Sequence, residues 1–443
     1  MSWRLLAAAF FSTMADVAML KAAVQALYSP TSSERERSEA NAWLMTFASS
    51  PPAWEAARVL LTEVDEQVRY FGANLLFMKV RSEWHGLPEE AKASIYGVVR
   101  ELVSQLASQS TAGGAWAPPS ASGKRLCLVL AAAAVRSSAL ESFTTEALSM
   151  GANPALAPIA LELLSALPQE LLDRTSAAAA AATGAAADAA KRGAGVGAAD
   201  AVPELRPELR ALLPQVIRLL VSLLATAAPA SGGPAAESCT TAVLRCLHSW
   251  LSLRMGCSLG TLIDSAPALL SAAMSGITSA AEPLSAAASD AIVELMLPAN
   301  TQLSPTVPAS VHATHALAEQ LQQAAVSLRI PDTIATREPL DERQFNCCCA
   351  LGAFAERACD VIAQTDGRLL PFVQLLFCLL GAEVWRAAPF ATEIVRRDPP
   401  PLVAHHAPRA TRCRRCCAPR AAAAAAAAAA RWLPRPADPT CGC

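Results

Sequence analysis

Apolar side chains recur every three or four positions along most of the chain, and this spacing predicts amphipathic helices. In the first such segment, residues 16–28, one stripe carries four of them. They are Val17, Leu20, Val24 and Leu27. Ser33 and Glu36 form a capping-box pattern at the start of a second segment, 33–48. Few stretches alternate apolar and polar residues as a strand would, so the pattern predicts an all-α protein.

Prolines, glycines and polar residues separate further helical segments downstream. We place these segments at about 52–62, 66–82, 88–107, 124–137, 160–171, 204–227, 243–253, 259–275, 283–297, 309–328, 341–364 and 367–382. Successive helix pairs return after roughly 35–45 residues, a period typical of HEAT-type arrays. Each repeat of such an array packs only on its neighbours. The sequence thus predicts an α-α superhelix, or solenoid, of about eight or nine HEAT-like repeats.

Three parts of the chain depart from this pattern. Residues 174–200 are rich in alanine and glycine, and we interpret them as a disordered or loosely helical insert. Residues 386–443 lack helical apolar periodicity and combine arginine, alanine, proline and cysteine, as GC-rich codons do in a wrong frame. We interpret this low-complexity tail as a gene-model artefact, above all from about residue 400; the alternative is a real segment that is not part of the packed array. Residues 1–15 are interpreted as an N-terminal extension, with a signal peptide as the alternative.

Charge is unevenly distributed along the chain. The net charge is −2, yet residues 400–443 hold seven arginines and one aspartate, which leaves 29 basic and 37 acidic residues before them. An acidic body argues against direct nucleic-acid binding and suits basic protein partners. No run reaches the roughly 20 uncharged apolar residues of a membrane-spanning helix, so no membrane partner is expected.

The residues that could carry chemistry form no convincing site. The fourteen cysteines show no paired framework and indicate small buried hydrophobes in a reducing compartment. His312 and His315 have no Cys or carboxylate at matching spacing. A group in the tail resembles a zinc cluster by letters only: His405, His406, Cys413, Cys416 and Cys417. With no phosphate-binding loop and no nucleophile set, we expect no enzyme activity, cofactor or metal.

Ordered segments of the chain resemble a known family. The first are AVQALYSP, AWLMTF, AWEAARVLL and YFGANLLFMKVRSEWHGLP, between residues 23 and 88. KRLCLVLAAAAVRS, LELLSALPQELL, VLRCLHSWLSL, SAAASDAIVELM and, more weakly, FVQLLFCLLGA follow in the same order. This series resembles nuclear transport receptors of the importin-β superfamily, and most of all the transportin-SR and importin-thirteen branch.

The resemblance implies a function and a set of partners. Such receptors bind the GTPase Ran in its GTP form, dock on Phe-Gly nucleoporins and carry protein cargo between cytoplasm and nucleus. Their first helices form a convex face with apolar grooves, and their second helices line a concave face. By resemblance, residues 16–138 are Ran-binding repeats and 139–385 are further repeats. Relatives are about twice as long, so we expect an N-terminal portion that lacks much of the cargo surface.

The resemblance places candidate Ran-binding residues on the second helices at 33–48, 66–82 and 124–138. These are the polar residues that we judge unnecessary for packing: Glu36, Asn41, Arg69, Asn74, Lys79 and Arg81. The alternative for each is the solvated edge of an amphipathic helix. Four aromatic residues are expected to pack in the core or between repeats: Trp43, Trp54, Phe71 and Trp84. The alternative function is a HEAT scaffold that assembles a complex without Ran, like a phosphatase regulatory arm.

Overall fold

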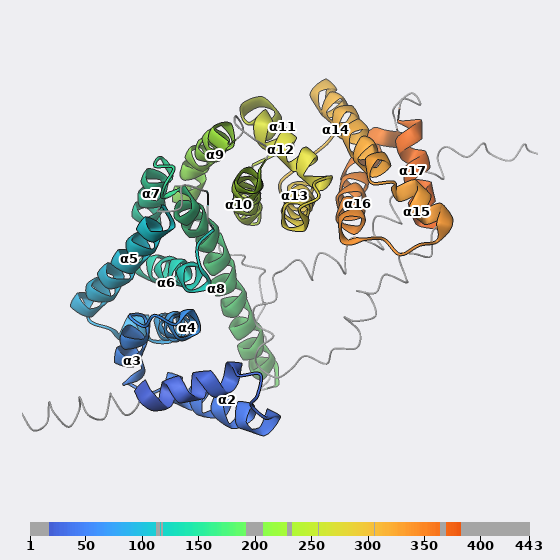
Figure 1. Cartoon of the computed structure of the whole chain (residues 1–443). Coiled ribbons are helices and arrows are strands. Elements are labelled where there is room, and N and C mark those ends of the chain that lie inside the picture. The colour runs from blue at the N-terminus through green and yellow to red at the C-terminus, as the bar shows by residue number, and fades with distance from the viewer. Residues whose placement is uncertain are drawn as a thin grey trace, which may run out of the picture. The chain divides into compact units, whose positions relative to one another are not determined.

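A computed structural model describes residues 17–111, 116, 118–191, 207–227, 233–255, 257–304, 306–363 and 369–381. Within these ranges the regular elements are helices, and no strand occurs among them (Figure 1). Within each compact unit, helices pack mainly on others that lie close to them in the chain. The predicted all-α helical-repeat solenoid is therefore confirmed.

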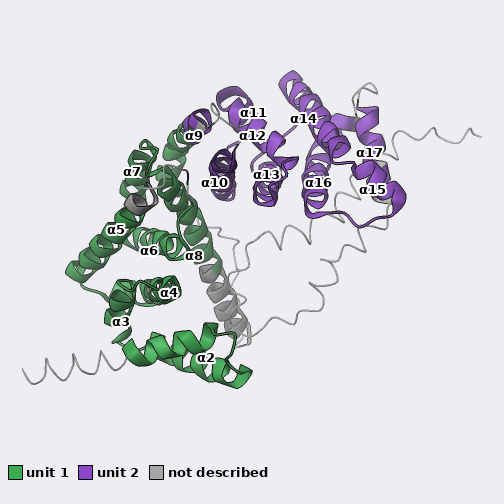
Figure 2. Ribbon diagram, in the orientation of Figure 1, with its two compact units in different colours: residues 1–219 green, residues 220–443 purple. Residues whose placement is uncertain are grey.

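The chain divides into two compact units, Met1–Leu219 and Leu220–Cys443 (Figure 2). The first unit contains helices Val17–Tyr28, α2 (Glu34–Ala48), α3 (Ala53–Leu60), α4 (Glu66–Glu83), the 3-10 helix η1 (Trp84–Gly86), α5 (Glu89–Thr111), α6 (Ala121–Ser137), α7 (Leu140–Gly151) and α8 (Ala157–Lys191). Helix α9 (Pro207–Ala227) crosses the border between the units. The predicted border between 138 and 139 thus falls inside the first unit.

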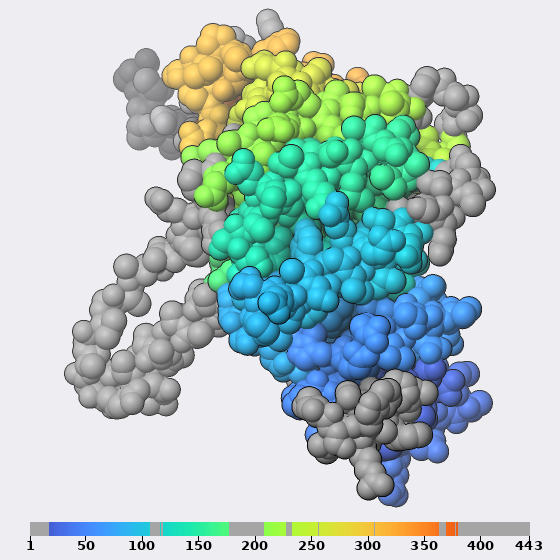
Figure 3. All heavy atoms as spheres, turned by 90° about the vertical axis from the view of Figure 1, so that its left-hand side faces the viewer, coloured from blue at the N-terminus to red at the C-terminus, as the bar shows by residue number. Residues whose placement is uncertain are grey.

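In the first unit the helices pair along the chain. Helix α3 packs on α4, α5 on α6, and α7 on α8. The second helices of these pairs also pack on one another, α4 against α6 and α6 against α8. In the space-filling view, successive parts of this unit lie as bands in chain order (Figure 3). Such neighbour-to-neighbour packing is the architecture that a HEAT-like repeat array requires.

Local sequence signals fix where the second helices begin. Ser33 and Glu36 form the predicted capping box of α2. The Asp65 carboxylate caps α4 by accepting from the backbone N–H of Gln67 at 2.8 Å. The Ser120 hydroxyl caps α6 by accepting from the N–H of Gly123 at 3.2 Å. Each cap satisfies a backbone N–H that has no partner within its helix.

The second unit repeats this plan. It contains α10 (Pro234–Leu251), α11 (Leu259–Ser265), α12 (Pro267–Ile277), α13 (Glu282–Leu295), α14 (Pro308–Ser327), α15 (Ile330–Thr336), α16 (Glu342–Ala363) and α17 (Leu370–Gly381). Helix α12 packs on α13 and α14 on α16, while α10 packs against α13 and α13 against α16. Helices α10, α13 and α16 therefore form a second stack of the same kind.

Several helices differ from the predicted ones. The helix expected at 259–275 is two helices, because Pro267 disfavours helical backbone at Ala266, whose φ is −148°. Helices α7 and α15 were not predicted. Helix α7 follows two serines and ends at Gly151, and α15 is only seven residues long. Helix α8 continues through Pro168 to Lys191, so the first part of the expected insert 174–200 is helical. The extension 1–15 and the tail 386–443 lie outside the described residues.

The described cysteines are free thiols, and most are buried as expected. Burial raises the pKa of Cys239 and Cys347 to about 12 and that of Cys257 to about 11. Cys378, expected to be buried, is instead exposed on α17. A thiol reacts through its thiolate, so buried thiols with raised pKa are inert.

We therefore expect N-ethylmaleimide to label Cys378 in the native protein and to spare Cys127 and Cys348. Both of these are buried, and burial raises each pKa well above the ordinary value. Peptide mapping by mass spectrometry before and after urea unfolding measures the difference. Labelling of Cys127 as fast as Cys378 in native buffer would contradict this packing.

Candidate functional site

The candidate residues belong to α2 and α4, two second helices of the first unit. We call the exposed sides of α2, α4, α6 and α8 the second-helix surface. Glu36 and Asn41 are exposed on α2. The Glu36 carboxylate already has partners within its own helix turn. It accepts from the Ser33 backbone N–H at 2.7 Å and from the Ser33 hydroxyl at 2.9 Å. These hydrogen bonds lower the pKa of Glu36. Glu36 therefore serves to cap the start of α2, while the side chain of Asn41 is exposed and can contact a partner.

Lys79 does not lie on that surface. Its side chain is 1% exposed, and Nζ donates to the Ser50 carbonyl at 3.0 Å and to the Glu83 carboxylate at 2.5 Å. Nζ also lies 5.8 Å from the centre of the Trp54 ring, and the Trp54 indole N–H donates to Glu83 at 2.9 Å. The expectation that Lys79 is unnecessary for packing is therefore wrong. A charged amine is buried here because carboxylate, carbonyl and ring all face it.

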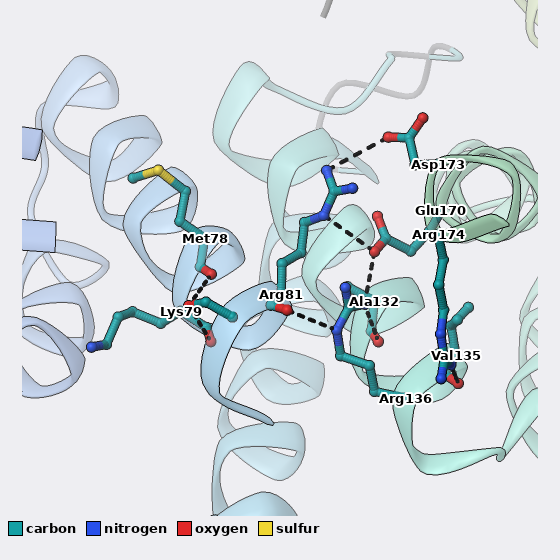
Figure 4. A network of polar contacts seen from close by, with 10 residues as sticks. Met78, Lys79, Arg81, Ala132, Val135, Arg136, Glu170, Asp173 and Arg174 are labelled. Atoms are coloured by element: carbon teal, nitrogen blue, oxygen red, sulfur yellow. Dashed lines mark hydrogen bonds and ion pairs between the residues drawn. The ribbon is translucent and has the colours of Figure 1, made fainter. Parts of the chain in front are cut away.

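Arg81 belongs to a buried ion network that joins three second helices. Its guanidinium lies 3.5 Å from Glu170 and 3.5 Å from Asp173, both on α8. The Glu170 carboxylate is 1% exposed and accepts from Arg136 of α6 at 2.7 Å. Arg136 also donates to the backbone carbonyl of Arg81. These side chains converge in Figure 4, where Lys79 points away from them.

The electrostatics of Glu170 reflect its burial. Desolvation raises its pKa, and the hydrogen bond from Arg136 and the charge of Arg81 oppose that rise. Since Arg136 is itself only 8% exposed, each charge depends on the other for compensation. These ion pairs thus hold neighbouring repeats together.

A second contact between repeats lies at the other end of α4. Glu66 accepts from the Ser122 backbone N–H at 2.8 Å and from its hydroxyl at 3.0 Å, and it pairs with Arg69 at 2.6 Å. Burial alone would raise the pKa of Glu66, but these contacts hold it below the ordinary value. Arg69 is thereby held against its own helix with 27% of its side chain exposed.

We expect Glu66→Gln to weaken the acid sensitivity of the first unit. A carboxylate with a lowered folded pKa stabilises the fold above its ordinary pKa of about 4.5, and this stability is lost as pH falls through the folded pKa. The gap in urea midpoint between wild type and Glu66→Gln should therefore shrink from pH 6 to pH 3. A gap that is constant over this range would contradict the assignment.

The remaining candidate, Asn74, brings in a residue that the sequence did not single out. Its amide oxygen accepts from the Arg125 guanidinium of α6 at 2.5 Å. The Arg125 side chain lies over two aromatic rings of α4, 4.7 Å from the centre of Phe77 and 5.9 Å from that of Tyr70. Arg125 stands in an apolar run, and only the pairing of α4 with α6 reveals its surroundings.

A groove opens on the first helices of the same unit, between α5 and α7. It encloses about 290 Å³, including space open to solvent. Its lining is mainly apolar and aromatic: Tyr96, Val103, Leu130, Phe143, Ala147, Met150 and Leu163, with Arg100, Ser104 and Glu146 beside them. Arg100 and Glu146 form an ion pair at 2.5 Å across it. The hollow is shallow, because only about 10 Å³ of it is free for the centre of a water-sized sphere, which is room for about one water molecule.

Other candidate chemistry is sparse in the described part of the chain. No group of three or more His, Cys, Asp or Glu side chains there is arranged to hold a metal ion. His405, His406 and the three tail cysteines lie outside the described residues. Residues Glu208–Thr226 of α9 are long and apolar enough to cross a membrane, but half of that stretch is buried in the fold, as in a core helix.

Comparisons with known proteins identify no family. No family model matches the chain, and no curated protein matches it. Matches among solved structures include the crystal structure of an engineered protein, 17% identical, which covers 86% of this chain and 99% of that one with a TM-score of 0.25. At this TM-score the likeness carries no argument about function.

Proposed function

We propose that the chain is a Ran-GTP-dependent nuclear transport receptor that shuttles protein cargo between cytoplasm and nucleus. One observation carries the proposal: most of the segments that resemble transport receptors fall on second helices, while 23–30 and 53–61 fall on first helices and 372–381 on α17. The segments at 70–88, 124–137 and 161–172 fall on α4, α6 and α8, and those at 243–253 and 285–296 on α10 and α13. A resemblance that follows the structural repeat supports the family more than scattered matches do.

A second part of the proposal is that a Phe-Gly nucleoporin docks over the hollow between α5 and α7. Phe-Gly nucleoporins present single phenylalanine rings on chains that are otherwise polar. The groove offers an apolar floor from α6 and α8 and lies between first helices of neighbouring repeats. A phenylalanine ring is larger than this hollow, so binding of a Phe-Gly peptide requires α5 and α7 to move apart. Ser104→Trp at the rim should reduce that binding, whereas Ser142→Trp on the exposed side of α7 should not.

The decisive experiment measures binding of the full chain to immobilised Ran. We expect the GTP form to bind at least roughly tenfold more tightly than the GDP form, a difference of about 1.4 kcal/mol. Arg69→Glu on α4 should weaken binding to the GTP form. Arg58→Glu is the matched control, since its side chain is 59% exposed on the first helix α3.

The outcome separates the two functions considered. If the chain is helical by circular dichroism yet binds neither form of Ran, the transport receptor is rejected. A HEAT scaffold that assembles a complex without Ran would then be the better description. Equal binding of both nucleotide forms would reject the receptor as well, because cargo release requires Ran to distinguish them.

A further inference from the structure

Among the four arginines of α4 and α6, Arg125 is the one with no carboxylate within ion-pair distance in the described part of the chain. Arg69 pairs with Glu66, and Arg81 and Arg136 pair with Glu170. No such ion pair involves Arg125 among the described residues; it donates hydrogen bonds to two neutral groups, the amide oxygen of Asn74 and the hydroxyl oxygen of Tyr70. A guanidinium without an anion in a repeat interface rich in carboxylates requires an explanation.

The surroundings of Arg125 make its lack of an anion costly. Burial lowers the pKa of Arg125, because the charged form loses water. Its Nε atom is buried and has no hydrogen-bond acceptor. A buried N–H that is left unsatisfied costs free energy that a ligand oxygen would recover. The site is therefore short of one acceptor, and a negatively charged acceptor most of all.

Aromatic residues hold the guanidinium in place and add donors beside it. The Phe77 and Tyr70 rings lie 4.7 and 5.9 Å from Arg125 Cζ. Tyr28, 45% exposed at the end of the first helix, adds a second phenol. Burial raises the pKa of Tyr28, the neighbouring Tyr70 raises it further, and Arg125 lowers it, so the three groups lie within electrostatic reach of one another. The Tyr70 hydroxyl accepts from Arg125 and keeps its own proton to donate to a ligand beside the guanidinium.

We propose that Arg125, with Tyr70 and Tyr28, is an oxyanion site that binds a carboxylate from an acidic segment of a protein partner. The planar fork of arginine matches the two oxygens of a carboxylate. Arg81 lies on the neighbouring second helix α4 and is 28% exposed, although Glu170 and Asp173 already pair with it. The inference rests on the proposed function only in that a protein partner meets the second-helix surface; it gives the chemistry of that contact.

Fluorescence anisotropy with a labelled octaglutamate peptide tests the site without Ran, so a failed Ran assay and a failed carboxylate site are distinguishable. Octaglutamine is the neutral counterpart, and inorganic phosphate is the competitor. We expect octaglutamate to bind the full chain and octaglutamine not to bind. Arg125→Gln should weaken binding roughly tenfold, and Tyr28→Phe, which removes only an exposed hydroxyl, by a smaller factor.

Arg100→Gln is the matched control, because Arg100 lies on the first helix α5 with 62% of its side chain exposed. Its affinity for octaglutamate should equal that of the wild type. Unchanged affinity in both Arg125→Gln and Tyr28→Phe, with thermal unfolding as in the wild type, overturns the proposal. Displacement of the peptide by phosphate at equal or lower concentration also overturns it, since the site would then be specific for a phosphoryl group.

Discussion

Replacement of Glu170 by alanine should lower the free energy of unfolding of the first unit by about 3–5 kcal/mol. The Glu170 carboxylate is 1% exposed, and it is the only carboxylate that the described residues place in an ion pair with Arg136. Its removal leaves Arg136 buried with backbone carbonyls alone as partners. An uncompensated buried charge is among the most destabilising changes a single substitution makes.

Urea unfolding at pH 7 followed by circular dichroism measures this loss, and hydrogen exchange assigns it to α4, α6 and α8. Glu141→Ala is the control, because Glu141 is an exposed glutamate of the neighbouring helix α7. Its effect should stay within about 0.5 kcal/mol. Equal losses in the two variants would show that Glu170 is not the centre of a buried network.

Gly72→Ala and Gly97→Ala should change stability in opposite directions. A Cβ on Gly72 of α4 would lie 2.8 Å from Leu60 Cβ and 3.2 Å from the Ala57 carbonyl oxygen of α3. Because these atoms belong to the backbone or lie next to it, the helices must separate, at a cost of about 1–3 kcal/mol. A Cβ on Gly97 of α5 meets no atom within 4 Å, so alanine should stabilise that helix by about 0.5–1 kcal/mol.

Thermal and urea unfolding of the two variants test this contrast directly. Both change a helical glycine to alanine, so helix propensity favours both equally. The difference between them therefore reports the approach of α3 to α4. Stabilisation by Gly72→Ala would mean that the two helices do not pack as closely as described.

The helices were predictable from the sequence where their apolar faces and caps were strong. The Ser33 and Glu36 capping box and the apolar stripe of residues 16–28 appear as expected. Alanine-rich segments were harder, since α8 extends to Lys191 through residues that have no large side chains to mark a face. The predicted helix 160–171 therefore stops well short of the observed end.

The candidate site was predictable only in part, because helical phase places a side chain on a face and does not reveal its partners. Asn41 is exposed and Arg69 is partly exposed as expected. Lys79 carries a charge and was therefore assigned to the surface, but Ser50, Trp54 and Glu83 enclose it. Arg125 was missed for the converse reason: its partners Tyr70, Asn74 and Phe77 are supplied by a different helix about 50 residues earlier.

The ion pairs of Glu170 reach beyond adjacent repeats. In an ideal repeat protein the stability is a sum of terms for single repeats and for neighbouring pairs. Glu170 of α8 contacts Arg136 on the adjacent second helix and Arg81 on the one before it. The ion pair between Glu170 and Arg81 therefore couples repeats that are not adjacent. We expect the three helix pairs that contain α4, α6 and α8 to unfold together as one cooperative unit. Under a stretching force, these pairs would separate in a single step, as one stiff segment of an otherwise elastic array.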